Sequence, residues 1–153
     1  MTDEVQLTRD GAVAIITLNR PDNGNAINVG LARGLVEAAI AVDQDADIRC
    51  VVMTGAGRMF CAGGDIGLML AAGEGAGGAL SELAGILHMA TSRLCRMAKP
   101  LVCAVNGPAA GAGLGMAIMG DIVIAGASAH FTPGYGGIGL TPDGGATWLL
   151  PRL

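Results

Sequence analysis

The sequence has 153 residues, of which 52% are hydrophobic, 14% charged and 3% aromatic, and its formal net charge is -4. This length predicts one domain over residues 1–153, and the composition excludes an intrinsically disordered chain. The acidic balance without a Lys/Arg cluster excludes a nucleic-acid-binding surface, and the four cysteines lack metal-ligand spacing, so we expect no metal site.

The first part of the chain alternates between strand and helix signals. Residues 1–4 are polar and acidic, which predicts no signal or transit peptide, and cysteines that read as buried thiols indicate a reducing, cytoplasmic compartment. The apolar pattern predicts a strand over 12–19, a helix over 29–42 capped by Asn28, and a buried strand over 48–53. We expect Val29, Ala32, Val36, Ala39 and Ile40 to form the buried face of this helix.

A loop over 60–66 feeds a short helix and is followed by a low-complexity patch, 71–79, that we expect to be mobile. An amphipathic helix is predicted from 80 to 97, followed by a strand over 101–105 and a turn over 106–108. A helix buried on all sides over 111–119, a strand over 121–125 and a final helix opening at 140–145 complete the pattern. Strands separated by helices predict a parallel-type α/β architecture.

Hydropathy alone raises the possibility of a membrane segment in the second half, because Asp121 is the only formal charge between residues 99 and 143. However, Asn106, Pro108, His130 and repeated glycines interrupt this stretch, and lipid does not tolerate exposed irregular backbone. We therefore expect buried strands and a buried helix in a soluble domain, with no membrane partner.

Two predicted junctions between a strand or loop and a helix consist of small residues: 62–65 (Ala-Gly-Gly-Asp) and 111–113 (Gly-Ala-Gly). Free backbone N–H groups at two such junctions can form an oxyanion hole if they point at one position. The alternative is that the glycines only permit tight packing between helix and strand. Sequences typical of a P-loop or of a serine nucleophile elbow are absent, and the glycine spacing does not fit a dinucleotide fingerprint.

Five segments then carry a family resemblance: 19–21 (Asn-Arg-Pro), 25–28 (Asn-Ala-Ile-Asn), 60–66, 104–113 and 120–125. They occur in the order seen in the crotonase (enoyl-CoA hydratase/isomerase) family and cover nearly the whole chain. The sequence therefore resembles the N-terminal part of such a protein. The resemblance implies an α/β crotonase-like ββα spiral fold whose C-terminal helical part is absent. In the family, that part covers the active site and builds a homotrimer or a dimer of trimers.

The resemblance also implies a ligand, an acyl-CoA thioester, and no separate cofactor because coenzyme A is carried by the substrate. It places the two oxyanion N–H donors at Gly64 and Ala112. The residues that it places around the substrate are Ala26, Ile27, Ala62, Gly63, Asp65, Ile66, Pro108, Gly111, Tyr135 and Leu140.

The sequence departs from the family's hydratases, because Gly115 and Tyr135 stand where two water-activating Glu residues are expected. Asp143 is the nearest candidate base, and the segment around it resembles the isomerising branch linked to phenylacetate degradation. The alternative for Asp143 is a helix N-cap. We expect Asp65 to be a cap or structural acid, Asp121 to hydrogen-bond at a strand end, and His88 to be solvated.

Three hypotheses follow for the activity. The first is an enoyl-CoA isomerase that uses Asp143, and the second is a hydratase with a non-standard water-activating group. The third is a non-catalytic acyl-CoA-binding or truncated protein.

Overall fold

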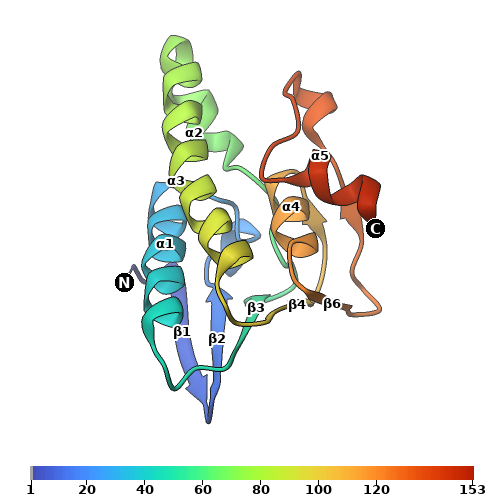
Figure 1. Ribbon diagram of the computed structural model, residues 1–153. Coiled ribbons are helices and arrows are strands. Elements are labelled where there is room, and N and C mark those ends of the chain that lie inside the picture. The colour runs from blue at the N-terminus through green and yellow to red at the C-terminus, as the bar shows by residue number, and fades with distance from the viewer. Residues whose placement is uncertain (1) are drawn as a thin grey trace.

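The computed structural model describes residues 2–153 (Figure 1). Met1, the first residue of the polar segment for which no targeting peptide is predicted, lies outside the described residues. None of the helices within residues 2–153 has both the length and the apolar character that crossing a membrane requires.

A five-stranded sheet forms the base of the fold. Its strands are β1 (Val5–Asp10), β2 (Val13–Leu18), β3 (Cys50–Gly55), β4 (Leu101–Val105) and β6 (Ile122–Ala125), and they are hydrogen-bonded in that order. The pairs from β2 to β6 are parallel, as predicted, and β1, which the sequence pattern did not indicate, adds an antiparallel edge.

The third strand lies two residues later than predicted. Gly55 pairs with Leu18 in the β2–β3 ladder and therefore belongs to the strand, although it looks like a turn signal. An ideally placed Cβ at Gly55 would lie 2.4 Å from the Phe60 carbonyl oxygen, so the glycine permits close backbone approach.

Two long helices pack against each other beside this sheet, α1 (Val29–Gln44) and α3 (Ala76–Arg96) (Figure 1). Asn28 caps α1 as predicted, because its Oδ1 accepts a hydrogen bond of 2.8 Å from the Leu31 N–H. The buried face of α1 is rotated from the predicted one. It is formed by Leu31, Ala32, Gly34, Leu35, Ala38, Ala39 and Val42, and Val29, Val36 and Ile40 are only partly buried.

The low-complexity patch 71–79 is largely helical, and its expected mobility stays a prediction. Helix α2 (Ile66–Ala71) runs into a 3-10 turn, Gly73–Gly75, and α3 already begins at Ala76. The Ala72 N–H donates to Leu68 O at 3.1 Å and the Gly75 N–H to Ala72 O at 2.9 Å. Helical hydrogen bonding thus continues through the segment and outweighs the low propensity of its glycines.

The second half builds a smaller layer beside the sheet. Strands β5 (Ala109–Ala110) and β7 (Phe131–Thr132) form a parallel pair, and helix α4 (Ala112–Ile118) is buried at every residue, as predicted. A 3-10 turn, Tyr135–Ile138, precedes the short helix α5 (Ala146–Leu149), which packs on α4 and leads into a last 3-10 turn, Leu150–Arg152 (Figure 1).

Strand β6 is exposed along its whole length, so its predicted burial is wrong. It lies at the edge of the sheet and pairs only with β4, and no other element within residues 2–153 covers it. Asp121, just before this strand, accepts a hydrogen bond of 2.8 Å from the Leu101 N–H, which confirms its strand-end role.

The cysteines only partly match the expectation of buried thiols. Cys61 and Cys103 are buried, and burial raises the pKa of each thiol to about 12. Cys50 is half-buried, and Cys95 is exposed.

Candidate functional site

The two predicted small-residue junctions lie side by side. The Ile27 N–H donates to Gly63 O at 2.7 Å, and the Asp65 N–H donates to Ile27 O at 2.9 Å, which fixes one edge of the first junction. On its other edge, the Ala110 N–H donates to Cys61 O at 2.9 Å. This ladder holds the segment around Gly64 next to the start of α4.

Two glycines permit this close approach. Gly63 has a φ of +93°, and an ideally placed Cβ there would lie 2.7 Å from Ala110 O and 3.5 Å from the Ala112 nitrogen. A Cβ at Gly113 would lie 2.4 Å from Cys61 O. The glycines therefore do serve tight packing, and the same packing brings the two junctions to one place.

The N–H groups of Gly64 and Ala112 are unused donors. Both hydrogen bonds to Ile27 come from the residues on either side of Gly64, namely the Gly63 carbonyl and the Asp65 N–H. The Gly64 N–H therefore points away from Ile27. Within residues 2–153, neither of the two N–H groups has a hydrogen-bond acceptor. Both residues line one cavity, and each N–H can serve a ligand there.

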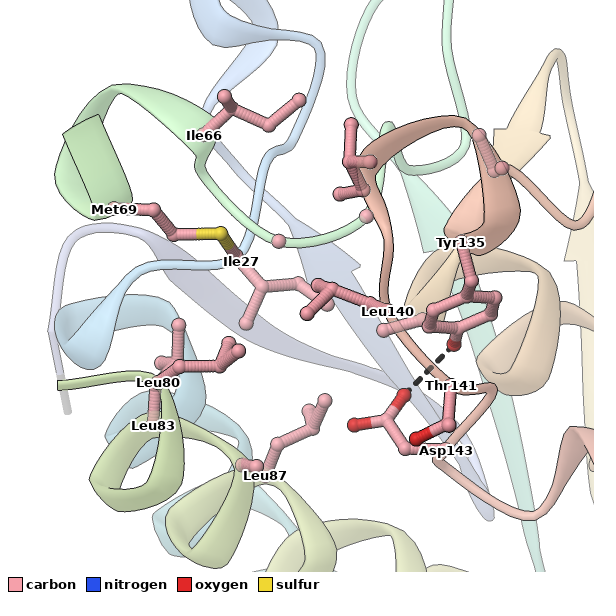
Figure 2. A pocket seen from close by; sticks show the side chains of 18 of the residues that line it. Ile27, Ile66, Met69, Leu80, Leu83, Leu87, Tyr135, Leu140, Thr141 and Asp143 are labelled. Carbon is pink, nitrogen blue, oxygen red and sulfur yellow. Dashed lines mark hydrogen bonds between the residues drawn. The ribbon is translucent and has the colours of Figure 1, made fainter. Parts of the chain in front are cut away.

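That cavity has a volume of about 540 Å³, within the range of small-ligand sites. Figure 2 shows Ile27, Ile66, Met69 and the α3 leucines on one side, facing Leu140, Tyr135 and Asp143. Its lining is largely apolar. The apolar side chains in it include Ile27, Ile66, Met69, Leu80, Leu83, Leu87, Ile138 and Leu140.

Asp143 directs its carboxylate into this cavity. The Tyr135 hydroxyl donates a hydrogen bond of 2.7 Å to Asp143 Oδ1, the dashed line of Figure 2. Burial raises the pKa of the Tyr135 phenol, and the hydrogen bond and charge of Asp143 raise it further, so the phenol stays protonated. Helix α5 begins at Ala146 after Gly145 without a side-chain cap. The interpretation of Asp143 as an N-cap is therefore wrong.

His88 is the second partner of Asp143. Its Nε2 lies 3.3 Å from Asp143 Oδ2, and its side chain is 47% exposed. This exposure confirms the expectation of a solvated histidine, but the sequence did not indicate that His88 meets Asp143, 55 positions away, at the cavity wall. A helical spacing that places residues 80, 84, 87 and 88 on one face of α3 could have indicated this position.

Gly115 supports the segment that carries Asp143. An ideally placed Cβ at Gly115 would lie 3.0 Å from Gly144 O and 3.7 Å from Asp143 O. The Asp143–Gly144 backbone therefore runs directly over α4 at this glycine. A methyl group at position 115 therefore requires this backbone to shift by a few tenths of an ångström.

Asp65 acts as a structural acid, as expected. Its Oδ1 accepts a hydrogen bond of 3.1 Å from the Gly67 N–H at the start of α2, and its Oδ2 lies 3.0 Å from Arg20 Nη1. Arg20 is also paired with Glu4, at 3.2 Å, and donates to the Ala26 carbonyl. This network holds the end of the first junction in place.

The cavity brings together most of the residues that the sequence indicated. Ala26, Asp65 and Pro108 do not line it, so their predicted contact with a substrate stays a prediction. The predicted residues that line it are Ile27, Ala62, Gly63, Gly64, Ile66, Gly111, Ala112, Tyr135, Leu140 and Asp143.

The sequence did not indicate His88 or the apolar wall formed by Met69, Leu80, Leu83 and Leu87. No group of three or more His, Cys, Asp and Glu side chains within residues 2–153 is arranged to hold a metal ion.

Comparison with known proteins adds to this geometry. A family model described as Enoyl-CoA hydratase/isomerase matches residues 8–153. The chain is 44% identical over 142 residues to the 1,2-epoxyphenylacetyl-CoA isomerase of Escherichia coli (strain K12), across 92% of the chain and 54% of that protein. It is 35% identical over 154 residues to the mitochondrial 3-hydroxyisobutyryl-CoA hydrolase of Rattus norvegicus, across 99% of the chain and 40% of that protein.

The fold is similar to that of solved structures as well. The structure of an enoyl-CoA hydratase from Polaromonas sp. JS666 superimposes with a TM-score of 0.90 at 36% identity, covering 97% of this chain and 58% of that chain. The predicted crotonase-like α/β fold is thereby confirmed. The chain spans about half the length of the relatives that it matches.

Proposed function

Because the chain belongs to the enoyl-CoA hydratase/isomerase family, an enzyme family that acts on acyl-CoA thioesters, we propose that it moves the double bond of an enoyl-CoA. The related proteins include an isomerase and a hydratase, so family membership alone does not select the reaction. The observation that carries the proposal is the Asp143 carboxylate, held by Tyr135 and His88 in the cavity that Gly64 and Ala112 also line.

The proposed oxyanion hole consists of the Gly64 and Ala112 N–H groups. Their lack of acceptors and their place on one cavity support this role. A thioester carbonyl between them would gain negative charge when its α-carbon loses a proton. Each such donor is worth about 2.7–4 kcal/mol to an anionic transition state.

Asp143 would be the single base. Its carboxylate takes a proton from the α-carbon, and the electron pair of that C–H bond moves through the carbonyl carbon to the thioester oxygen. The protonated carboxyl group then returns the proton to the γ-carbon, which converts a 3-enoyl-CoA into a 2-enoyl-CoA. No water is added and no other group is consumed, so one carboxylate suffices.

Gly115 and Tyr135 argue against ordinary hydration. The Tyr135 hydroxyl donates its hydrogen bond to Asp143, and Gly115 has no side chain where the Asp143–Gly144 backbone passes over α4. Two carboxylates that activate water therefore cannot lie at these positions. We expect weak or absent water addition to crotonyl-CoA.

The test compares the complete protein that contains this chain with its Asp143→Asn variant, using trans-3-hexenoyl-CoA as the probe. Conjugation of the product is followed by absorbance, and water addition by mass spectrometry. We expect the variant to bind the probe with unchanged affinity but to isomerise it at least about 10²-fold more slowly, because it lacks general-base assistance.

Asp22→Asn is the matched control, since Asp22 is an exposed carboxylate that does not line the cavity. Isomerisation at the wild-type rate by Asp143→Asn would refute the proposal and favour a non-catalytic binder or another base. Robust water addition by the wild-type protein would favour the hydratase instead.

A further inference from the structure

The two oxygens of the Asp143 carboxylate have different partners. Oδ1 accepts the hydrogen bond from Tyr135, at 2.7 Å, whereas Oδ2 lies 3.3 Å from His88 Nε2. Tyr135 is only 8% exposed, and its phenol remains a donor, so Oδ1 stays an acceptor whether or not the carboxylate is protonated. A proton that Asp143 takes from a substrate therefore resides on Oδ2, the oxygen next to His88.

Within residues 2–153, His88 is the more solvent-exposed member of this pair. Its imidazole is 47% exposed, whereas the Asp143 side chain is 32% exposed and becomes more enclosed once a substrate fills the cavity. Among the described residues that line the cavity, His88, Tyr135 and Asp143 are the only titratable ones. Since Tyr135 keeps its proton, His88 is the one neighbour that can exchange a proton with Asp143.

Resting on the isomerase function proposed above, we infer that His88 relays protons between Asp143 Oδ2 and solvent during the lifetime of the enolate. The proton on Oδ2 moves to His88 Nε2, which leaves Asp143 as a carboxylate and His88 as an imidazolium. Water then accepts that proton, and a solvent proton returns to Asp143 by the same route. The proton count is unchanged, but the proton delivered to the γ-carbon now originates from solvent.

The relay makes an isotopic prediction. In deuterated water, wild-type protein converts trans-3-hexenoyl-CoA into a product that carries solvent deuterium at the γ-carbon, which mass spectrometry measures as the ratio of labelled to unlabelled product. His88→Gln keeps an amide that can donate to Oδ2 but cannot accept a proton. We expect this ratio to fall at least about tenfold, because the general acid–base assistance of the imidazole is lost.

Two controls separate the relay from structural effects. Glu82→Gln changes an exposed residue of the same helix that does not line the cavity, and it should keep the wild-type ratio. His88→Ala should lose label as His88→Gln does and regain it when free imidazole is added. The ratio is taken on whatever product forms, so slower turnover does not hide the effect.

The outcomes are distinct. An unchanged ratio in His88→Gln, or a wild-type product that retains the substrate proton throughout, overturns the relay. The absence of isomerisation in wild-type protein instead refutes the proposed function, independently of His88.

Discussion

Substitution of Gly115 by Ala tests how the Asp143 segment is held over α4. The added methyl group would begin 3.0 Å from Gly144 O, closer than an ordinary van der Waals contact. Gly144 and Gly145 both adopt positive φ values, of 58° and 85°, in a segment that can shift without breaking regular structure. We therefore expect the segment to move by a few tenths of an ångström and to carry Asp143 with it.

Stability and activity should then respond differently. Gly→Ala inside a helix gains about 0.8–1 kcal/mol from propensity, and the tight contact costs about 1 kcal/mol or somewhat more, so the free energy of unfolding should change little. Activity should fall by about tenfold, since a displacement of 1 Å at a reacting group can cost about 10²-fold.

Gly85→Ala is the matched control for this substitution. Gly85 lies inside helix α3, and a Cβ there meets no atom within 4 Å. This variant should gain the full 0.8–1 kcal/mol of propensity and keep wild-type activity. Urea unfolding measures stability, and the hexenoyl-CoA assay measures activity. If Gly115→Ala gains as much stability as Gly85→Ala and isomerises at the wild-type rate, the Asp143 segment does not depend on Gly115.

Two further substitutions probe the site and its scaffold. Tyr135→Phe should lower kcat with little change in KM, because Asp143 loses its fixed donor, and equal kcat would show that Tyr135 does not orient it. The free energy of unfolding should fall by only about 1 kcal/mol, because water can reach the partly exposed carboxylate in the ligand-free protein. Asn25→Asp should lower the free energy of unfolding, measured in urea, by at least about 3 kcal/mol, because the fully buried Asn25 amide donates to three backbone carbonyl groups. Asn23→Asp, on the exposed side of the same loop, should change stability little, and equal effects of the two substitutions would contradict this account.

Short sequence patterns predicted the elements that depend on residues close to one another in the chain. The Asn28 cap and the apolar period of α3 depend on residues within a few positions of one another, and both are confirmed. The predicted strand stops before Gly55, and the predicted helix begins only at residue 80, because glycine signals a turn or a flexible segment in sequence. In the fold, Gly55 allows Phe60 to approach, and the patch joins two helices, so distant or neighbouring structure overrides the local signal.

The exposed strand β6 was mispredicted for a different reason. Its sequence has the apolar character of a buried parallel strand, yet within residues 2–153 it pairs on one side only. Hydrophobicity indicates that a strand is suited to burial, and it does not say which part of a protein buries it.

The candidate site shows the same division between local and distant information. Gly64, Ala112 and Asp143 were predicted from short motifs, and all three line the cavity. His88 was not, because its partner lies 55 positions away and no local pattern links them. The consequence is chemical. A single carboxylate predicted from sequence could act only as a base of unknown orientation. The structure supplies Tyr135 on one oxygen and His88 on the other, and this asymmetry makes the direction of proton movement testable.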